Sequence, residues 1–193
     1  MSKELDKEFE INKETYKELL PADNFTLLDL GSGSQQRTMY FNFSYCYAVD
    51  VSPNYANETN ARPHTQFILK DVIEFLTEDK RMWDVVVAFE VVEHLEFHRA
   101  LIFIKLMKQH AKKLVMIITP DGFAYNFQNP NLINNPYEHR CGFIQEQYEF
   151  LDFTVIRKVD ARIDMKARHD KEQVPYPPTW DRLLAYWRPN ESV

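Results

Sequence analysis

The sequence lacks several features that would assign it to a special class of protein. Its two cysteines, Cys46 and Cys141, are far apart and form no Cys-x-x-Cys pair. This excludes the usual signatures of a zinc site and of a disulfide framework, and we expect two reduced thiols in or near the core. No apolar run approaches the roughly 20 residues that span a bilayer. The first eight residues are charged and lack the apolar core of a secretion signal, so we expect a cytoplasmic protein with no membrane partner.

Positive charge is also in short supply. The chain has 23 Lys and Arg against 29 Asp and Glu, a net charge of −6, which argues against a general nucleic-acid binder because phosphate contacts need clustered basic residues. One segment is locally basic, through Arg157, Lys158, Arg162, Lys166, Arg168 and Lys171. Four acidic residues are interleaved with them, namely Asp160, Asp164, Asp170 and Glu172. The mixture favours a solvated surface of both charges over a nucleic-acid site.

Hydrophobic residues make up 45% of the chain and aromatic residues 14%, which excludes a disordered protein. A length of 193 residues suits one domain, which we expect to span residues 1–193. Apolar residues from about Lys3 to Leu20 are spaced for one face of a helix that stops at Pro21, so residues 1–21 are assigned to an N-terminal helix. This helix either pads the core or folds over a ligand as a lid. Residues 120–143 are predicted to form an insertion, with a long loop from Asn126 to Tyr137.

Apolar strand candidates alternate with helical or loop segments along the chain. The first five are Thr26 to Leu30, Cys46 to Asp50, Gln66 to Leu69, Asp84 to Phe89 and Lys113 to Thr119. A crossover helix is predicted from Glu96 to His110 and a short helix from Ile144 to Phe150, followed by strands at Phe153 to Val159 and Arg182 to Trp187. The pattern predicts a doubly wound, Rossmann-like α/β fold with three layers, α/β/α. Its seven-stranded sheet would be mostly parallel, with the last strand antiparallel.

Acidic residues stand at or just beyond the ends of the first four strands: Asp29, Asp50, Asp71 and Glu90. In an open parallel sheet, ligands bind at this edge. Each acid could instead cap the helix that follows, and for Asp71 this interpretation is strong. The two roles are compatible, because both use the same loop.

The first strand leads into Gly31-Ser32-Gly33, and Asp50 follows nineteen residues after Gly31. Glycines let the backbone approach a ligand closely, and an acid at this distance can accept hydrogen bonds from ribose hydroxyls. A dinucleotide-binding fingerprint needs a third glycine at position 36, where this chain has Gln36. The loop therefore indicates an adenosine-containing ligand other than a dinucleotide.

These residues resemble the class I S-adenosylmethionine-dependent methyltransferases over roughly Thr26 to Thr119. The segment Leu28 to Ser34 is similar to the family's glycine-rich first motif, Val49 to Ser52 to the second, Lys70 to Val72 to the third and Trp83 to Leu95 to the fourth. The resemblance implies S-adenosylmethionine as cofactor and S-adenosylhomocysteine as product. The cofactor-binding residues that it implies are Asp29, Gly31, Gly33, Asp50, Val51, Asp71, Val72, Phe89 and Glu90. Many members carry a third glycine where this chain has Gln35, a departure that bears on cofactor affinity.

Within this set, Asp50 would hold the ribose, Val51 and Val72 would flank the adenine, and Asp71 would lie near the adenine amino group. Methyl transfer also needs an acceptor aligned with the methyl group and a base for its proton. The candidates for this base are His94 and His139, of which His139 could instead anchor the substrate. Each of the two could alternatively be a structural histidine. Tyr137, Glu138 and Arg140 are predicted to contact the acceptor, and we predict no metal ligand.

The sequence favours methyl transfer to a small molecule or another acceptor that is not a nucleic acid. Two alternatives stay open. RNA or DNA is the acceptor in one, recognised through the basic residues between Arg157 and Lys171. The other is a protein that binds the cofactor without catalysis and regulates a partner.

Overall fold

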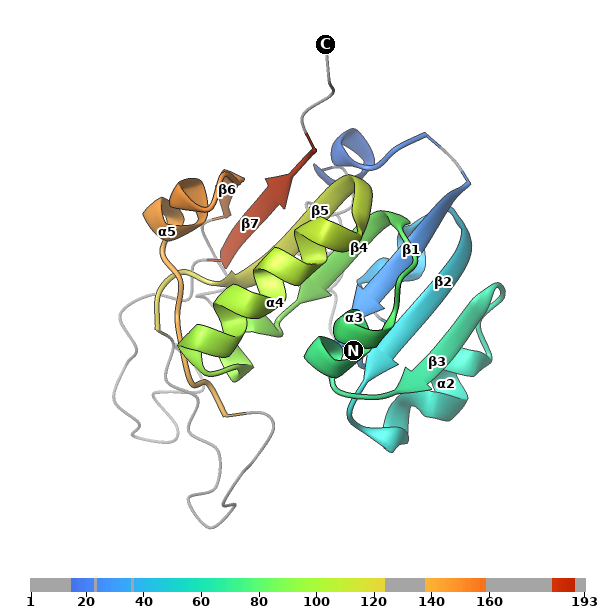
Figure 1. The fold of residues 1–193 in the computed structure, drawn as a ribbon. Coiled ribbons are helices and arrows are strands. Elements are labelled where there is room, and N and C mark those ends of the chain that lie inside the picture. The colour runs from blue at the N-terminus through green and yellow to red at the C-terminus, as the bar shows by residue number, and fades with distance from the viewer. Residues whose placement is uncertain (1–14, 23, 36, 124–137, 159–181, 190–193) are drawn as a thin grey trace, which may run out of the picture. The chain divides into compact units, whose positions relative to one another are not determined.

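The computed structural model describes residues 15–22, 24–35, 37–123, 138–158 and 182–189 (Figure 1). Residues 15–19 are helical, in agreement with the end of the predicted N-terminal helix, whose earlier part lies outside the described residues. The predicted loop from Asn126 to Tyr137 and all of the basic segment beyond Lys158 also lie outside them.

Seven strands form one sheet, in the order β3-β2-β1-β4-β5-β7-β6. Their bounds are β1 (Phe25–Leu30), β2 (Phe43–Asp50), β3 (Thr65–Leu69), β4 (Trp83–Phe89), β5 (Ala111–Pro120), β6 (Thr154–Lys158) and β7 (Arg182–Trp187). The pairs β1–β2, β1–β4 and β2–β3 are parallel, whereas β7 runs antiparallel to β6. The predicted fold class is confirmed, including the antiparallel last strand.

Helices connect and flank these strands. The α-helices are α2 (Ala56–Asn60), α3 (Val72–Glu78), α4 (Phe97–His110) and α5 (Gln145–Phe150), and the short 3-10 helices are η1 (Thr38–Tyr40), η2 (Pro53–Tyr55) and η3 (Val92–His94). The sheet order reverses at β1, because β2 and β3 lie on one side of it and β4 on the other. Right-handed crossovers then require α2 and α3 to lie on opposite faces of the sheet. Such a reversal is where doubly wound sheets bind their ligands.

The chain divides into two compact units. The first comprises the residues up to Ala88 with residues 105–115 and 188–193, and the second comprises Phe89–Ile104 and Met116–Trp187. That the whole chain is a single domain stays a prediction. No helix in the described ranges is long and apolar enough to cross a membrane.

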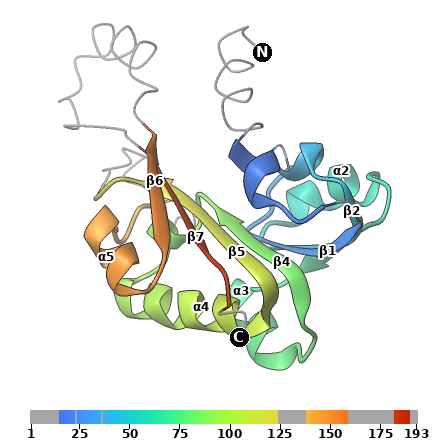
Figure 2. The ribbon, with the colours of Figure 1, turned by 90° about the horizontal axis from the view of Figure 1, so that it is seen from above.

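Each unit has its own apolar core. In the first, β1 and β4 are buried along almost their whole length, as expected for parallel strands covered on both faces. In the second, the rings of Phe143, Tyr148 and Phe153 pack in sequence, with centroids 5.1 and 5.8 Å apart. Figures 1 and 2 both show β6 and β7 side by side, with α5 beside them. Both cysteines are buried and form no disulfide, as predicted.

Candidate active site

The glycine loop (residues 31–35) follows β1 in the first unit and turns over the end of β2. The amide groups of Gly31 and Ser32 donate to the carbonyl of Val49 at 2.8 and 3.1 Å. Gly31 and Gly33 have φ angles of +67° and +50°, which glycine adopts without the steric cost of a Cβ. Among the described residues, apart from Gly33 itself and its two chain neighbours, no heavy atom lies within 4 Å of the place where a Cβ of Gly33 would stand. The backbone at Gly33 is thus open to a ligand.

Asp50 ties this loop to the turn after β2. Its Oδ2 accepts a hydrogen bond from the Gly33 amide and its Oδ1 one from the Ser52 amide, both at 2.8 Å. A carboxylate oxygen can accept a second hydrogen bond, so Asp50 can hold the loop and still accept hydroxyl groups of a ligand.

Ser32 adds a polar group that the sequence prediction did not include. Its hydroxyl oxygen is buried and has no hydrogen-bond partner within the described residues. A buried hydroxyl without a partner is costly, and a polar group of a bound ligand would satisfy it. The signal available in the sequence was its position between the two glycines.

Asp29 is buried, with 3% of its surface exposed. Its Oδ2 accepts hydrogen bonds from Thr38 Oγ1 at 2.8 Å and from Gln35 Nε2 at 3.2 Å. Burial raises the pKa of Asp29 to about 6, although both hydrogen bonds lower it. These contacts hold the glycine loop and η1 to the end of β1, and direct contact between Asp29 and the cofactor stays a prediction.

Gln35 stands where many relatives of the first motif carry glycine, and its φ angle is +55°. This conformation costs a residue with a side chain about 1 kcal/mol. The side chain is 2% exposed and lies beside Asp29 and Cys46. Arg62 Nη1 donates to the Gln35 carbonyl at 2.7 Å. The Gln35 side chain is therefore held by contacts in the interior and does not extend toward the open backbone at Gly33.

The predicted adenine-binding residues follow β2 and β3. Val51 is 53% exposed, so its side chain is accessible at the end of β2. Asp71 caps α3, because its Oδ1 accepts from the amides of Ile73 and Glu74 at 2.9 and 3.1 Å. Val72 is buried, with 6% exposed. The capping role of Asp71 is confirmed, and the adenine contacts stay predictions.

The second unit begins with Phe89, the last residue of β4, and Glu90 follows it directly. Phe89 is buried, and Glu90 has a φ angle of +58° and donates its amide to the Ile118 carbonyl at 2.8 Å. The Glu90 carboxylate forms an ion pair with Arg182, with 2.9 Å between Oε1 and Nε.

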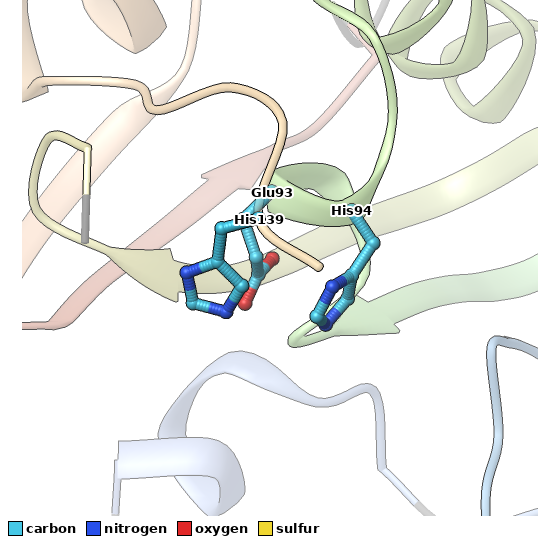
Figure 3. A group of neighbouring side chains, drawn as sticks. All are labelled: Glu93, His94 and His139. Atoms are coloured by element: carbon cyan, nitrogen blue, oxygen red, sulfur yellow. The ribbon is translucent and has the colours of Figure 1, made fainter. Parts of the chain in front are cut away.

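The Glu-His cluster (Glu93, His94 and His139) follows in the same unit (Figure 3). One potential ligand atom from each residue lies within 4.8 Å of the other two. The imidazole centroids of His94 and His139 are 4.9 Å apart. The structure thus brings together the two histidines that the sequence singled out, and adds Glu93, which the prediction missed. Its only signal was its place directly before His94.

Backbone contacts hold the segment of His139 against η3. The amides of Arg140 and Cys141 donate to the Glu93 carbonyl at 2.7 and 3.2 Å, and the Cys141 thiol donates to the Val92 carbonyl at 3.2 Å. Of the residues predicted to contact an acceptor, Glu138 and Arg140 belong to this segment, and Tyr137 lies outside the described residues.

Electrostatics distinguish Glu93 from an ordinary surface acid, since it is 1% exposed. Its Oε2 accepts a hydrogen bond from Thr119 Oγ1 at 3.3 Å, whereas Oε1 has no partner within the described residues. Burial, with the nearby charge of Glu90, raises the pKa of Glu93 well above its usual range. Burial also lowers the pKa of His94, which favours a neutral imidazole.

Comparisons with known proteins agree with this fold. Residues 28–122 match a family model described as a methyltransferase domain. Among curated proteins, no relative matches the sequence. Solved structures match over nearly the whole chain, at low identity. The N-methyltransferase NodS from Bradyrhizobium japonicum WM9, in complex with S-adenosylhomocysteine, has a TM-score of 0.65 and 16% identity, over 94% of this chain and 87% of that one.

Two further solved structures are of enzymes that are named for different kinds of acceptor. The 1,6-didemethyltoxoflavin-N1-methyltransferase of Burkholderia thailandensis, with its namesake compound and S-adenosylhomocysteine bound, has a TM-score of 0.61 and 16% identity over 93% of this chain and 77% of that one. An rRNA methylase from Streptococcus thermophilus has a TM-score of 0.54 and 13% identity over 92% and 94%.

Proposed function

Because this chain belongs to the class I S-adenosylmethionine-dependent methyltransferases, we propose that it methylates a small-molecule acceptor and releases S-adenosylhomocysteine. The net charge of −6 favours an acceptor that is not a nucleic acid. The names of two structurally similar proteins, the N-methyltransferase NodS and the toxoflavin-precursor methyltransferase, are compatible with this choice.

The glycine loop carries the cofactor part of the proposal. It combines an open backbone at Gly33, a buried Ser32 hydroxyl that has no partner among the described residues, and the Asp50 carboxylate that joins the loop to β2. We assign the backbone of Gly31 and Gly33 to the methionine part of the cofactor and Asp50 to the ribose hydroxyls. The remaining cofactor contacts are assigned to Val51, Asp71, Val72, Phe89 and Glu90. Asp29 positions the loop through Gln35 and Thr38.

The chemistry is an in-line displacement at the sulfonium methyl carbon. A bond forms between the acceptor's nucleophilic atom and the methyl carbon while the carbon–sulfur bond breaks, which leaves a neutral thioether. The enzyme must align the two reactants, exclude water and assist the loss of the acceptor's proton. We assign this assistance to His139 and His94, and contacts with the acceptor to Tyr137, Glu138 and Arg140.

A thermal-shift experiment with S-adenosylmethionine, S-adenosylhomocysteine and NAD tests the cofactor assignment. A ligand at one hundred times its dissociation constant stabilises a protein by about 2.7 kcal/mol. For a domain near this size, the expected rise in melting temperature is roughly 5–10 °C. NAD is the control and should produce no shift. A folded sample that responds to neither adenosyl compound would contradict the proposal.

A panel of acceptors then separates the functional alternatives, with release of S-adenosylhomocysteine as the readout. Small molecules with hydroxyl or amino groups should be methylated. Turnover with RNA alone would instead favour the nucleic-acid alternative, for which the similarity to an rRNA methylase is the present support. Turnover with any acceptor would eliminate a protein that binds the cofactor without catalysis.

A further inference from the structure

The Glu-His cluster has the donor set of a transition-metal centre, and we propose that Glu93, His94 and His139 bind one divalent metal ion that activates the acceptor's hydroxyl group. The metal site stands on the geometry of the second unit alone. Its role toward the acceptor rests on the proposed function.

The ligand atoms are close to coordination distance. Metal–nitrogen and metal–oxygen bonds to such ligands measure about 2.0–2.2 Å, so two ligands of one ion lie at most about 4.4 Å apart. The three atoms of the cluster all lie within 4.8 Å of one another. Small rotations of the side chains therefore suffice to close the site, and Figure 3 shows the three side chains converging on one region.

A backbone contact orients His94 for this role. Its Nδ1 lies 3.2 Å from the carbonyl oxygen of Glu138. A carbonyl can only accept, so Nδ1 carries the proton and Nε2 keeps its lone pair for a metal. Histidine ligands are commonly held in this way by a carbonyl behind the ring. The Thr119 hydroxyl supports Glu93 similarly, by donating to Oε2.

An independent observation is the burial of the Glu93 carboxyl group. The residue is 1% exposed. Among the described residues, its Oε1 has no hydrogen-bond partner, and no lysine or arginine forms an ion pair with it. The neighbouring Glu90 differs in this respect, because it pairs with Arg182. A buried carboxylate is costly unless it is paired or coordinates a metal. A bound cation would supply the missing partner.

The donor set also indicates the class of metal. Two imidazoles and one carboxylate suit zinc, manganese, iron or cobalt, whereas magnesium and calcium prefer sites made wholly of oxygen ligands. Three protein ligands leave coordination positions open, as in catalytic sites.

A hydroxyl group bound at an open position loses its proton more readily, because the metal stabilises the resulting oxyanion. The proton passes to solvent, the oxygen–methyl bond forms and the carbon–sulfur bond breaks, with no change in the oxidation state of the metal. The proposal thus predicts an oxygen acceptor. The two imidazoles assist loss of the proton through the metal, since a nitrogen that coordinates a metal cannot itself take the proton.

Metal binding to the purified chain tests the site directly. After treatment with a chelator, the protein is titrated with Zn²⁺, Mn²⁺ and Co²⁺ by calorimetry, and bound metal is counted by elemental analysis. We expect one ion per chain for at least one of these metals. Glu93→Gln and His139→Ala should each weaken binding at least tenfold, whereas His98→Ala, at an exposed position of α4, should leave it unchanged. Thermal unfolding of each metal-free variant checks that it is folded.

The results separate this inference from the proposed function. S-adenosylhomocysteine should shift the melting temperature equally with and without chelator, because the residues assigned to it above do not include the cluster. Turnover of a hydroxyl acceptor should fall at least tenfold with chelator and recover when the metal is returned. The inference would be overturned if the folded protein bound no metal, or if the two ligand variants bound it as tightly as the wild type, and either result would leave the cofactor assignment intact. Metal binding without an adenosyl-induced shift would instead contradict the proposed function.

Discussion

At the scale of single residues, burial decides what Asp29 and Gln35 do. The sequence singles out Asp29 as a cofactor-binding residue and Gln35 as a departure from the glycine pattern. In the structure, the Gln35 side chain donates to Asp29, which also accepts from Thr38. Asp29 thereby keeps the loop in place, at the cost of holding a carboxyl group out of water. That cost appears in its pKa, which burial raises to about 6.

The raised pKa makes the stability of the protein depend on pH. An unfolded Asp has a pKa near 3.9, so between pH 4 and pH 6 the folded state binds more protons than the unfolded state. Stability from this group is present below pH 4 and is lost as pH rises through 6. A difference of about two pKa units corresponds to about 3 kcal/mol.

The variant Asp29→Asn isolates this effect, because its amide oxygen can still accept from Thr38 and Gln35. Urea unfolding of both proteins from pH 4 to pH 7 should show the wild type losing about 2 kcal/mol relative to the variant, because part of the full difference lies below pH 4. A stability difference that stays constant over this range would show that Asp29 has an ordinary pKa in the folded protein.

Residues whose roles depend on distant partners are those that the sequence could not place. That Gln35 departs from the glycine pattern is visible in the sequence, but where its side chain goes depends on Asp29, Cys46 and Arg62. Glu93 was missed for the same reason. Its carboxylate becomes unusual only because the chain buries it and returns, with His139, to its side.

At the scale of elements, strands were predicted well because parallel strands buried on both faces read as continuous apolar runs. All seven were located, and Arg182–Trp187 was predicted with its bounds as observed. The largest difference is at β2, which begins at Phe43, whereas the prediction began at Cys46. Ser44 and Tyr45 are exposed, so the continuous buried run on which the prediction relied begins only at Cys46. A hydrophobic pattern cannot reveal the first residues of a strand when these pair through their backbone and their side chains are exposed.

The connection between β5 and α5 gives a prediction at this scale. Gly142 packs against the backbone of residues 122 and 123, and an added Cβ would lie 2.4 Å from Gly122 C and Phe123 N. Backbone atoms cannot move aside as a flexible side chain can, so Gly142→Ala should push the His139 segment away from β5. The hydrogen bond from the Gly122 amide to the Phe143 carbonyl, 2.8 Å long, would weaken. We expect a loss of about 1–3 kcal/mol in urea unfolding.

Gly122→Ala is the matched control for this substitution. Its Cβ would make only an ordinary contact, 3.7 Å from Ile144 Cγ2, although the φ angle of +78° adds strain of about 1 kcal/mol. Gly142→Ala should therefore be the less stable of the two, and of the two it should also weaken metal binding more. Equal stabilities would mean that the close approach at Gly142 does not hold the segment.

At the scale of the whole molecule, the class of cofactor was easier to infer from the sequence than the identity of the methyl acceptor. The residues that we assign to the cofactor lie in short segments at strand ends, whose order and spacing can be read from the sequence. The residues that we assign to the acceptor, Tyr137, Glu138 and Arg140, follow no such strand-end pattern in the sequence. The Glu-His cluster, assembled from η3 and the segment before α5, lies in that less predictable class.

The amount by which the cofactor stabilises the folded chain should depend on Asp50. If Asp50 accepts hydrogen bonds from the ribose, Asp50→Ala should weaken affinity for S-adenosylhomocysteine by about 1–3 kcal/mol, or roughly fivefold to 150-fold. At a concentration that stabilises the wild type by about 2.7 kcal/mol, a thirtyfold loss of affinity would leave the variant only about 0.9 kcal/mol. The ligand-induced rise in melting temperature should shrink from roughly 5–10 °C to roughly 2–4 °C. Asp50→Asn distinguishes a lost contact with the ligand from a disturbed glycine loop, because the amide oxygen of Asn can still accept a hydrogen bond from the Gly33 amide. Calorimetric titration of the three proteins checks the order of affinities, and an unchanged affinity in both variants would show that the ribose is held elsewhere.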